Sequence, residues 1–176
     1  PRLAMSILYP GAWFDGRFFD PLDPSSPDYH QNAAAPRTGY NVLKYSKVVS
    51  SDLLQNGGEN VIVIRLAEVL LTYAEAAIES DQITNDVYGA IDQVRLRAGM
   101  PAVDRTVYNT QAQLRIVVRR ERRVELAFEG LRYWDIKRWD IGQTALNGPF
   151  YGSHEGSVDS QTGVVTWGSN QIKLEE

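Results

Sequence analysis

The sequence predicts a mainly α-helical fold with long ordered loops and a few short strands. Apolar residues recur at helical spacing through the middle of the chain, and Leu114–Asp140 is dense in charged and aromatic residues without a proline. Residues that favour turns dominate both flanks. We therefore expect one domain over 1–176, with a helical core at 61–140, a loop-rich segment carrying an aromatic loop at 1–60 and a loop-rich extension at 141–176.

The composition limits the classes of function. The chain has 176 residues, a formal net charge of −4 and no cysteine. This acidic balance disfavours a nucleic-acid partner, because phosphate binding needs a net basic surface. The lack of cysteine excludes disulfides, thiol catalysis and cysteine metal sites. No run of 18 apolar residues occurs, so the sequence predicts no membrane-spanning helix.

The first helix is expected over Arg65–Ser80. Its polar side chains gather in one narrow wedge, which consists of Arg65, Glu68, Thr72, Glu75 and Glu79. Apolar side chains cover the rest of the circumference, a pattern typical of a helix that is buried on most sides. We expect the acidic wedge to offer carboxylates to neighbouring helices.

A second helix is expected over Asp86–Ala98, where Gly99 and Pro101 stop it. Together the first two helices have about the length of a tetratricopeptide repeat unit. The sequence therefore predicts a tetratricopeptide-like helix pair.

The third helix is expected to begin at Thr110, which has with Gln113 the spacing of a capping box. Gly130 interrupts it, so Leu131–Asp140 forms a shorter fourth helix. The aromatic residues of the fourth helix are expected to pack in the core; they are Tyr133, Trp134 and Trp139. These two helices resemble a further, degenerate pair.

The third helix is the most charged element. Its expected core-facing stripe consists of Val117, Val124, Ala127, Phe128 and Leu131, and Arg120 falls in the middle of it. Like charges stand four residues apart on its other faces, a spacing that destabilises an isolated helix. We infer that opposite charges reach it from other helices, in an ion-pair lattice formed by Arg65, Glu68, Glu75, Arg120, Glu121 and Glu125. An anion site and a solvated charged face are the alternatives.

Short strands are expected at Ala4–Tyr9, Tyr40–Lys47 and Val164–Trp167. The loop between the first two carries the predicted ligand surface, whose residues are Trp13, Phe14, Asp15, Arg17, Phe18, Phe19 and Tyr29. Aromatic faces can stack on the C–H faces of sugars, while Asp and Arg can fix hydroxyl groups. Alternatively, these aromatic residues cover the helical core from outside.

Few residues point to catalysis. The two histidines, His30 and His154, lie far apart in the sequence and match no metal-binding spacing. There is no G-x-S-x-G elbow and no P-loop, so we expect no cofactor, no metal site and no enzyme activity. Paired carboxylates for glycoside hydrolysis remain a less favoured alternative, and the acidic residues concerned are Asp15, Asp20, Asp23 and Asp28.

Three stretches resemble the C-terminal core motifs of SusD/RagB-type proteins. They are VIRLAEVLLTYAEA at Val63–Ala76, AIDQVRLRAGMP at Ala90–Pro101 and RRERRVELAFEGLRYWDIKRW at Arg119–Trp139, and they occur in the order found in that family. The matching framework positions of the first motif are Arg65, Glu68 and Glu75. Those of the last are Arg120, Glu121, Arg122, Glu125, Glu129, Gly130, Arg132, Trp134, Asp135 and Trp139.

The resemblance implies a nutrient-binding lipoprotein on the surface of the outer membrane. Such a protein binds an oligosaccharide or other nutrient without catalysis and passes it to a TonB-dependent transporter. Membrane attachment would be through a lipidated N-terminus that this chain does not contain, and the chain would be a C-terminal fragment. A helical-repeat scaffold for protein partners without sugar binding, and a glycan-cleaving enzyme, are the two alternatives.

Overall fold

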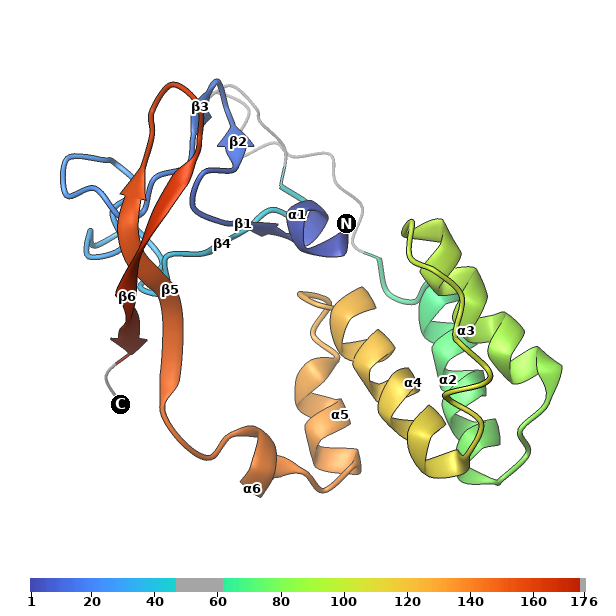
Figure 1. The fold of residues 1–176 in the computed structure, drawn as a ribbon. Helices are drawn as coiled ribbons and strands as arrows, with labels where there is room; N and C mark the ends of the chain where they lie inside the picture. The colour runs from blue at the N-terminus through green and yellow to red at the C-terminus, as the bar shows by residue number, and fades with distance from the viewer. Residues whose placement is uncertain (47–61, 175–176) are drawn as a thin grey trace. The chain divides into compact units, whose positions relative to one another are not determined.

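The computed structural model describes residues 1–46 and 62–174. The chain divides into two compact units, which are described here one at a time. The helical unit comprises Asp52–Trp139 together with Pro1–Arg2, and the second unit comprises Leu3–Ser51 and Asp140–Glu176. Figure 1 shows helices α2 to α5, which belong to the first unit, and strands β1 to β6, which belong to the second.

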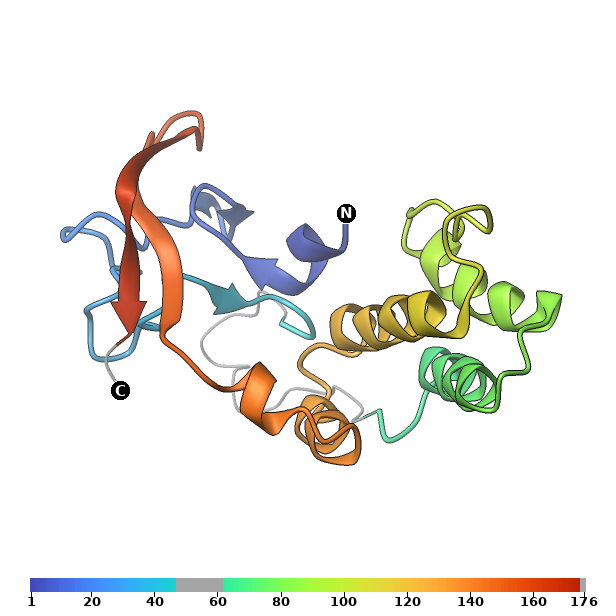
Figure 2. The same ribbon diagram turned by 60° about the horizontal axis from the view of Figure 1, so that its bottom comes forward.

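The helical unit contains the four helices that the sequence predicts. They are α2 at Leu66–Glu79, α3 at Asn85–Arg97, α4 at Gln111–Glu125 and α5 at Arg132–Arg138. Helix α2 packs against both α3 and α4, as Figure 2 shows from a second direction. The three helices enclose a core of fully buried side chains, including Leu71, Ile78, Val87, Ile91, Leu114 and Val118.

The predicted helix boundaries are confirmed. Thr110 and Gln113 form the expected capping box at the start of α4, each bonding the other's backbone N–H. Between α4 and α5 the backbone reaches positive φ at Phe128 (64°) and Gly130 (76°), which no helix can accommodate. Gly99, just beyond α3, has φ of 70° and provides the expected glycine stop.

The predicted buried faces of α2 and α4 are partly wrong. On α2, Leu66 and Val69 are 66% and 53% exposed, so the helix is not buried on most sides by the described part of the chain. Of the expected stripe, Val124 on α4 and Phe128 just beyond the helix are exposed, and only Val117 is buried. The buried face of α4 instead consists of Leu114, Val117, Val118, Glu121, Arg122 and Glu125.

The aromatic residues of α5 also differ from the prediction. Tyr133 and Trp134 are 59% and 62% exposed and pack edge-to-face on each other, with ring centroids 5.1 Å apart. Their expected burial in the core is wrong within the described residues. The tetratricopeptide-like character of the α2–α3 pair remains a proposal.

The second unit is built from short antiparallel pairs. Strand β1 (Ile7–Leu8) pairs with β4 (Asn41–Val42), and β2 (Trp13–Phe14) pairs with β3 (Arg17–Phe18). The strand predicted at Ala4–Tyr9 is shorter than expected, because helix α1 occupies Arg2–Ser6. The strand predicted at Tyr40–Lys47 shrinks to β4, and Lys47 lies outside the described residues.

A long hairpin follows the short helix α6 (Gly142–Ala145). Its strands are β5 at Phe150–Val158 and β6 at Val165–Leu174, of which the sequence predicted only Val164–Trp167. Gly in both strands and Asn170 in β6 lower the local preference for strand, which explains the miss. Asp159 closes the turn, since its Oδ1 accepts the N–H groups of Gln161 and Thr162.

Candidate functional site

The aromatic loop predicted to bind ligand is a tight β-hairpin. Asp15 and Gly16 connect β2 to β3 and both have positive φ, 50° and 78°. A two-residue turn of this kind matches the twist of the flanking strands and favours Asp-Gly. The turn places Trp13 opposite Phe18, where the two rings meet edge-to-face at 4.9 Å. The Trp13 side chain is 64% exposed, so one aromatic face is available to a ligand.

The other side of the hairpin is anchored in the second unit. Phe19 is only 5% exposed, and its backbone N–H and C=O pair with Ala12 and Gly11. Gly163, in the turn of the β5–β6 hairpin, lies against the Phe18 ring, where any side chain would collide. Phe19 therefore stabilises the hairpin and does not present its ring to solvent, contrary to its predicted place among the ligand contacts. The remaining contacts predicted here remain predictions, including half-buried Phe14.

Arg17 joins the hairpin to the segment that carries Tyr29. Its guanidinium forms an ion pair with Asp28, and Nη2 donates to Oδ1 at 3.0 Å. The hydrogen bonds from Arg17 to Asp28 raise the pKa of the guanidinium. Arg17 was predicted as a ligand contact, but in this structure much of its hydrogen-bonding capacity is used by Asp28.

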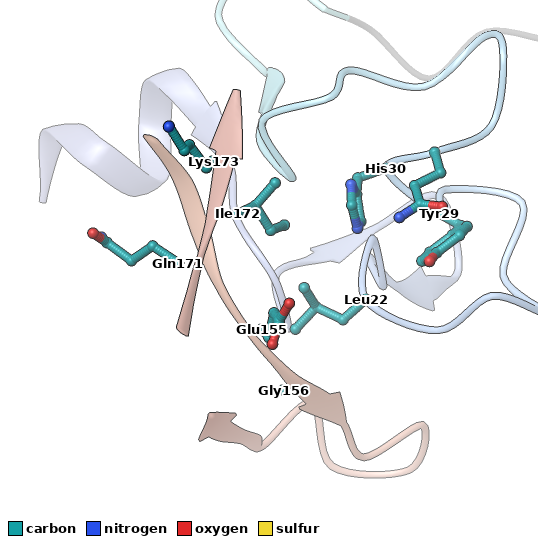
Figure 3. Close-up of a pocket in the computed structure, with 9 residues that line it drawn as sticks. Leu22, Tyr29, His30, Glu155, Gly156, Gln171, Ile172 and Lys173 are labelled. Carbon is teal, nitrogen blue, oxygen red and sulfur yellow. The ribbon is translucent and has the colours of Figure 1, made fainter. Parts of the chain in front are cut away.

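Tyr29 and His30 line a polar pocket of about 410 Å³ (Figure 3). Their rings meet edge-to-face, with centroids 4.8 Å apart. The opposite wall comes from the β5–β6 hairpin, where Ile172 points toward His30 and Glu155 lies beside Leu22. The side chains of Gln171 and Lys173 point to the other face of β6, as strand alternation requires, so these two residues line the pocket mainly with backbone.

The electrostatics of the pocket keep His30 neutral. Burial lowers the pKa of the imidazole, Arg37 lowers it further, and the nearby Glu155 carboxylate opposes both. At pH 7 the ring can therefore donate one hydrogen bond and accept another. Glu155 itself accepts only a long bond from Asn170, at 3.4 Å, among the described residues. A neutral imidazole, a phenol and a carboxylate around one hollow suit a ligand rich in hydroxyl groups.

Sequence reasoning identified Tyr29 but missed His30 and Glu155. These two residues stand 125 positions apart, and only the β5–β6 hairpin brings them to one hollow. That hairpin was itself largely missed. Without it, no local pattern indicates that residue 155 belongs to the same site.

The ion pairs of the helical unit lie in a different part of the molecule. Glu121 and Glu125, both on the buried face of α4, meet arginines from other elements. Arg95 of α3 pairs with Glu121, and Arg65 bonds Glu125 at 2.8 Å. Arg97 also reaches Glu125, at 2.6 Å. Arg2, which belongs to this unit, adds contacts to both carboxylates at 2.7 and 3.4 Å.

Glu75 of α2 forms a second centre. It accepts two hydrogen bonds from Arg138, at 2.7 and 2.6 Å, and one from the indole N–H of Trp139. Arg122 lies 3.5 Å from the same carboxylate and also donates to Asp135. Because carboxylates of other elements hold Arg122 and Arg138, the arrangement binds α2, α4 and α5 to one another.

Two residues of the predicted ion-pair lattice, Arg120 and Glu68, form no ion pair among the described residues. Arg120 is exposed and has no carboxylate partner in the described part of the chain, so its predicted burial is wrong. The buried arginine of α4 is Arg122, two residues later and about 200° around the helix. Glu68 likewise has no ion pair among residues 1–46 and 62–174. The error came from choosing the buried face by its apolar residues, whereas the buried face of α4 is charged in its second half.

Two kinds of site are absent from the described residues. No group of three or more His, Cys, Asp or Glu side chains is placed to hold a metal ion. None of the described helices has both the length and the apolar character needed to cross a membrane.

Comparison with known proteins gives the family. The model of the SusD family matches residues 1–173. The chain belongs to the SusD family, as its three motifs indicated.

Relatives and a solved structure agree with this assignment. SusD-like protein P38 of Formosa agariphila is 33% identical over 119 residues, which are 62% of this chain and 23% of that protein. SusD-like protein P2 of the same organism is 37% identical over 95 residues, 49% of this chain and 19% of its own. A crystal structure of a SusD-like protein from Bacteroides fragilis superposes with a TM-score of 0.68 at 26% identity, covering 96% of this chain and 34% of that one. The chain thus spans between a fifth and a third of the length of these relatives.

Proposed function

We propose that this chain is part of a protein that captures a nutrient glycan at the outer surface of the outer membrane, without cleaving it. The exposed ring of Trp13 carries the proposal, because a rigid turn holds it and its partner Phe18 leaves one face open. An aromatic ring presented this way suits the C–H face of a sugar. The pocket at Tyr29 and His30 offers hydroxyl-binding groups in the same unit.

Family membership supports the rest of the proposal. A SusD-family protein is expected to be anchored through a lipidated N-terminus and to hand its ligand to a TonB-dependent transporter. The ion pairs around Glu75, Glu121 and Glu125 support a framework role for the helical unit, which leaves ligand capture to the second unit. We propose this division of roles together with the localisation and the transporter partner.

Calorimetry on the full-length protein that contains this chain tests the proposal. Binding is measured against a glycan panel for the parent and for Trp13→Ala, with Trp134→Ala as the matched control. Trp134 is equally exposed but lies on α5 in the helical unit. We expect Trp13→Ala to weaken binding roughly tenfold or more, as loss of a stacking aromatic contact does, and Trp134→Ala to leave the affinity unchanged. Parent-like affinity in Trp13→Ala rejects the hairpin as the ligand surface.

One observation favours a second function. Leu66, Val69 and Tyr73 on α2 are exposed, and a helix face of this kind is suited to a protein partner. A scaffold without sugar binding would bind no member of the glycan panel and would still be recovered with a protein partner.

A further inference from the structure

The pocket at Tyr29 and His30 continues into a second hollow. The second hollow has a volume of about 510 Å³ and shares His30, Gln31, Ile172 and Lys173 with the first. Two hollows with four common lining residues form one groove. Their sizes lie within the range of small-molecule sites, so the groove has room for a short oligosaccharide.

The two halves of the groove differ in charge. The first half is lined by Glu155 and contains no arginine, whereas the second is lined by Arg37 and contains no carboxylate. Both charges act on His30, which lies in both halves: the carboxylate favours the protonated ring and the guanidinium disfavours it. Lys173 lines both halves, but its side chain points to the other face of β6.

Neither charge is neutralised by the described part of the chain. Arg37 is exposed and forms no ion pair with residues 1–46 or 62–174, and Glu155 has only the long bond from Asn170. Elsewhere in this unit Arg17 is paired with Asp28, and in the helical unit the buried carboxylates are all paired with arginines. Arg37 and Glu155 can therefore interact directly with a ligand in the groove.

We propose that this groove binds a glycan bearing an anionic group, a carboxylate or a sulfate ester, on one sugar unit and only hydroxyl groups on the next. The anionic unit lies in the half with Arg37, because a guanidinium recognises carboxylate and sulfate oxygens in a fork. The uncharged unit lies in the half with Glu155, whose carboxylate accepts hydroxyl hydrogens and repels a second anion. This inference rests on the proposed function and specifies the class of ligand.

The test uses the full-length protein and two sets of oligosaccharides in calorimetry. The acidic set holds κ-carrageenan and glucuronoxylan oligosaccharides, in which an anionic unit neighbours an uncharged one, together with alginate and galacturonate oligosaccharides, which carry a charge on every unit. The neutral set holds malto-, xylo- and galacto-oligosaccharides. We expect the tightest ligand to be acidic. Arg37→Gln should lower the affinity for that ligand roughly tenfold or more, because one charge-assisted contact is lost. Arg120→Gln, which removes another exposed guanidinium, from the helical unit, should leave the affinity unchanged.

Glu155→Gln separates the two halves of the groove. It should strengthen binding of galacturonate oligosaccharides, which carry a charge on every unit, by removing the repulsion. Tightest binding by a neutral glycan, parent-like affinity in Arg37→Gln, or no gain in Glu155→Gln overturns the inference and leaves the proposed function standing. A parent protein that binds neither set refutes both.

Discussion

Arg122 and Asp135 meet as a buried fork, in which Nε donates to Oδ2 and Nη2 donates to Oδ1, each at 3.2 Å. Both side chains are about 5% exposed, and Arg122 Nη1 also donates to Thr72 at 2.9 Å. The fork joins α4 to α5, and the bond to Thr72 adds α2. One arginine thus holds three helices through charge-assisted hydrogen bonds, which are roughly twice as strong as neutral ones.

Arg122→Ala should destabilise the helical unit by about 3–5 kcal/mol, because it leaves Asp135 buried beside only one remaining arginine. Arg120→Ala is the matched control and should change stability by less than about 0.5 kcal/mol, since Arg120 is exposed. Urea unfolding followed by circular dichroism measures both. Equal losses in the two variants would contradict the assignment of the buried arginine to position 122.

Glu75→Ala should be comparably severe, at about 3–5 kcal/mol. The Glu75 side chain is 7% exposed. Its carboxylate accepts hydrogen bonds from Arg138 and Trp139 and forms an ion pair with Arg122. Its removal leaves these donors without their acceptor at the junction of α2, α4 and α5. Glu68→Ala, one acidic residue earlier on α2, should have little effect, because no ion pair holds Glu68 in the described part of the chain. Thermal unfolding of the pair measures the contrast, and a stable Glu75→Ala protein would argue against this centre.

The interaction of Glu79 with Arg115 should make the stability of the fold depend on pH. Hydrogen bonds from Arg115 lower the pKa of this carboxyl below its ordinary value of 4.5. A lowered folded-state pKa means that the stabilisation is fully present above 4.5 and is lost as the pH falls through the folded-state value. Glu79→Gln should therefore be less stable than the parent at pH 7, with the difference shrinking below pH 4.5. A difference that stays constant from pH 7 to pH 3 would rule out this linkage.

The hairpin that presents Trp13 depends on Gly16. At φ of 78° a side chain is strained, so Gly16→Ala should destabilise the turn by roughly 1–2 kcal/mol. Asp15→Asn is the control, because Asn tolerates φ of 50° as well as Asp does. Hydrogen exchange at the Phe19 amide, which donates to Ala12 C=O at 2.8 Å, reports opening of this hairpin. Unchanged exchange in Gly16→Ala would show that the turn is not under this constraint.

The sequence was sufficient for the helices because their signals are local. The Thr110–Gln113 capping box, the Gly99 stop and the interruption at Gly130 depend on residues within a few positions of one another. The identity of the buried arginine was not predictable in this way. Arg120 and Arg122 are equal in type, and only the positions of Glu75 and Asp135 on other helices decide which is buried.

In the candidate site, too, features with a local sequence signal were predicted and features that depend on distant residues were missed. Trp13 was identified because the aromatic residues of WFDGRFF stand close together in the sequence and can stack on sugars. Tyr29 was identified by its residue type, but the pocket that it lines was not, since Glu155 and Ile172 reach it across a hairpin rich in glycine and serine. Strand pairing between distant residues leaves a weak trace in a single sequence, and the groove depends on it.

Hydrogen–deuterium exchange of the full-length protein, with and without its tightest glycan, shows which unit binds the ligand. If the second unit captures the glycan, bound glycan slows exchange in peptides covering Trp13–Phe19, Tyr29–Gln31 and the β5–β6 hairpin, and exchange in α2 to α5 stays unchanged. Slower exchange confined to the helices at Leu66–Arg138, with none in the second unit, would contradict it.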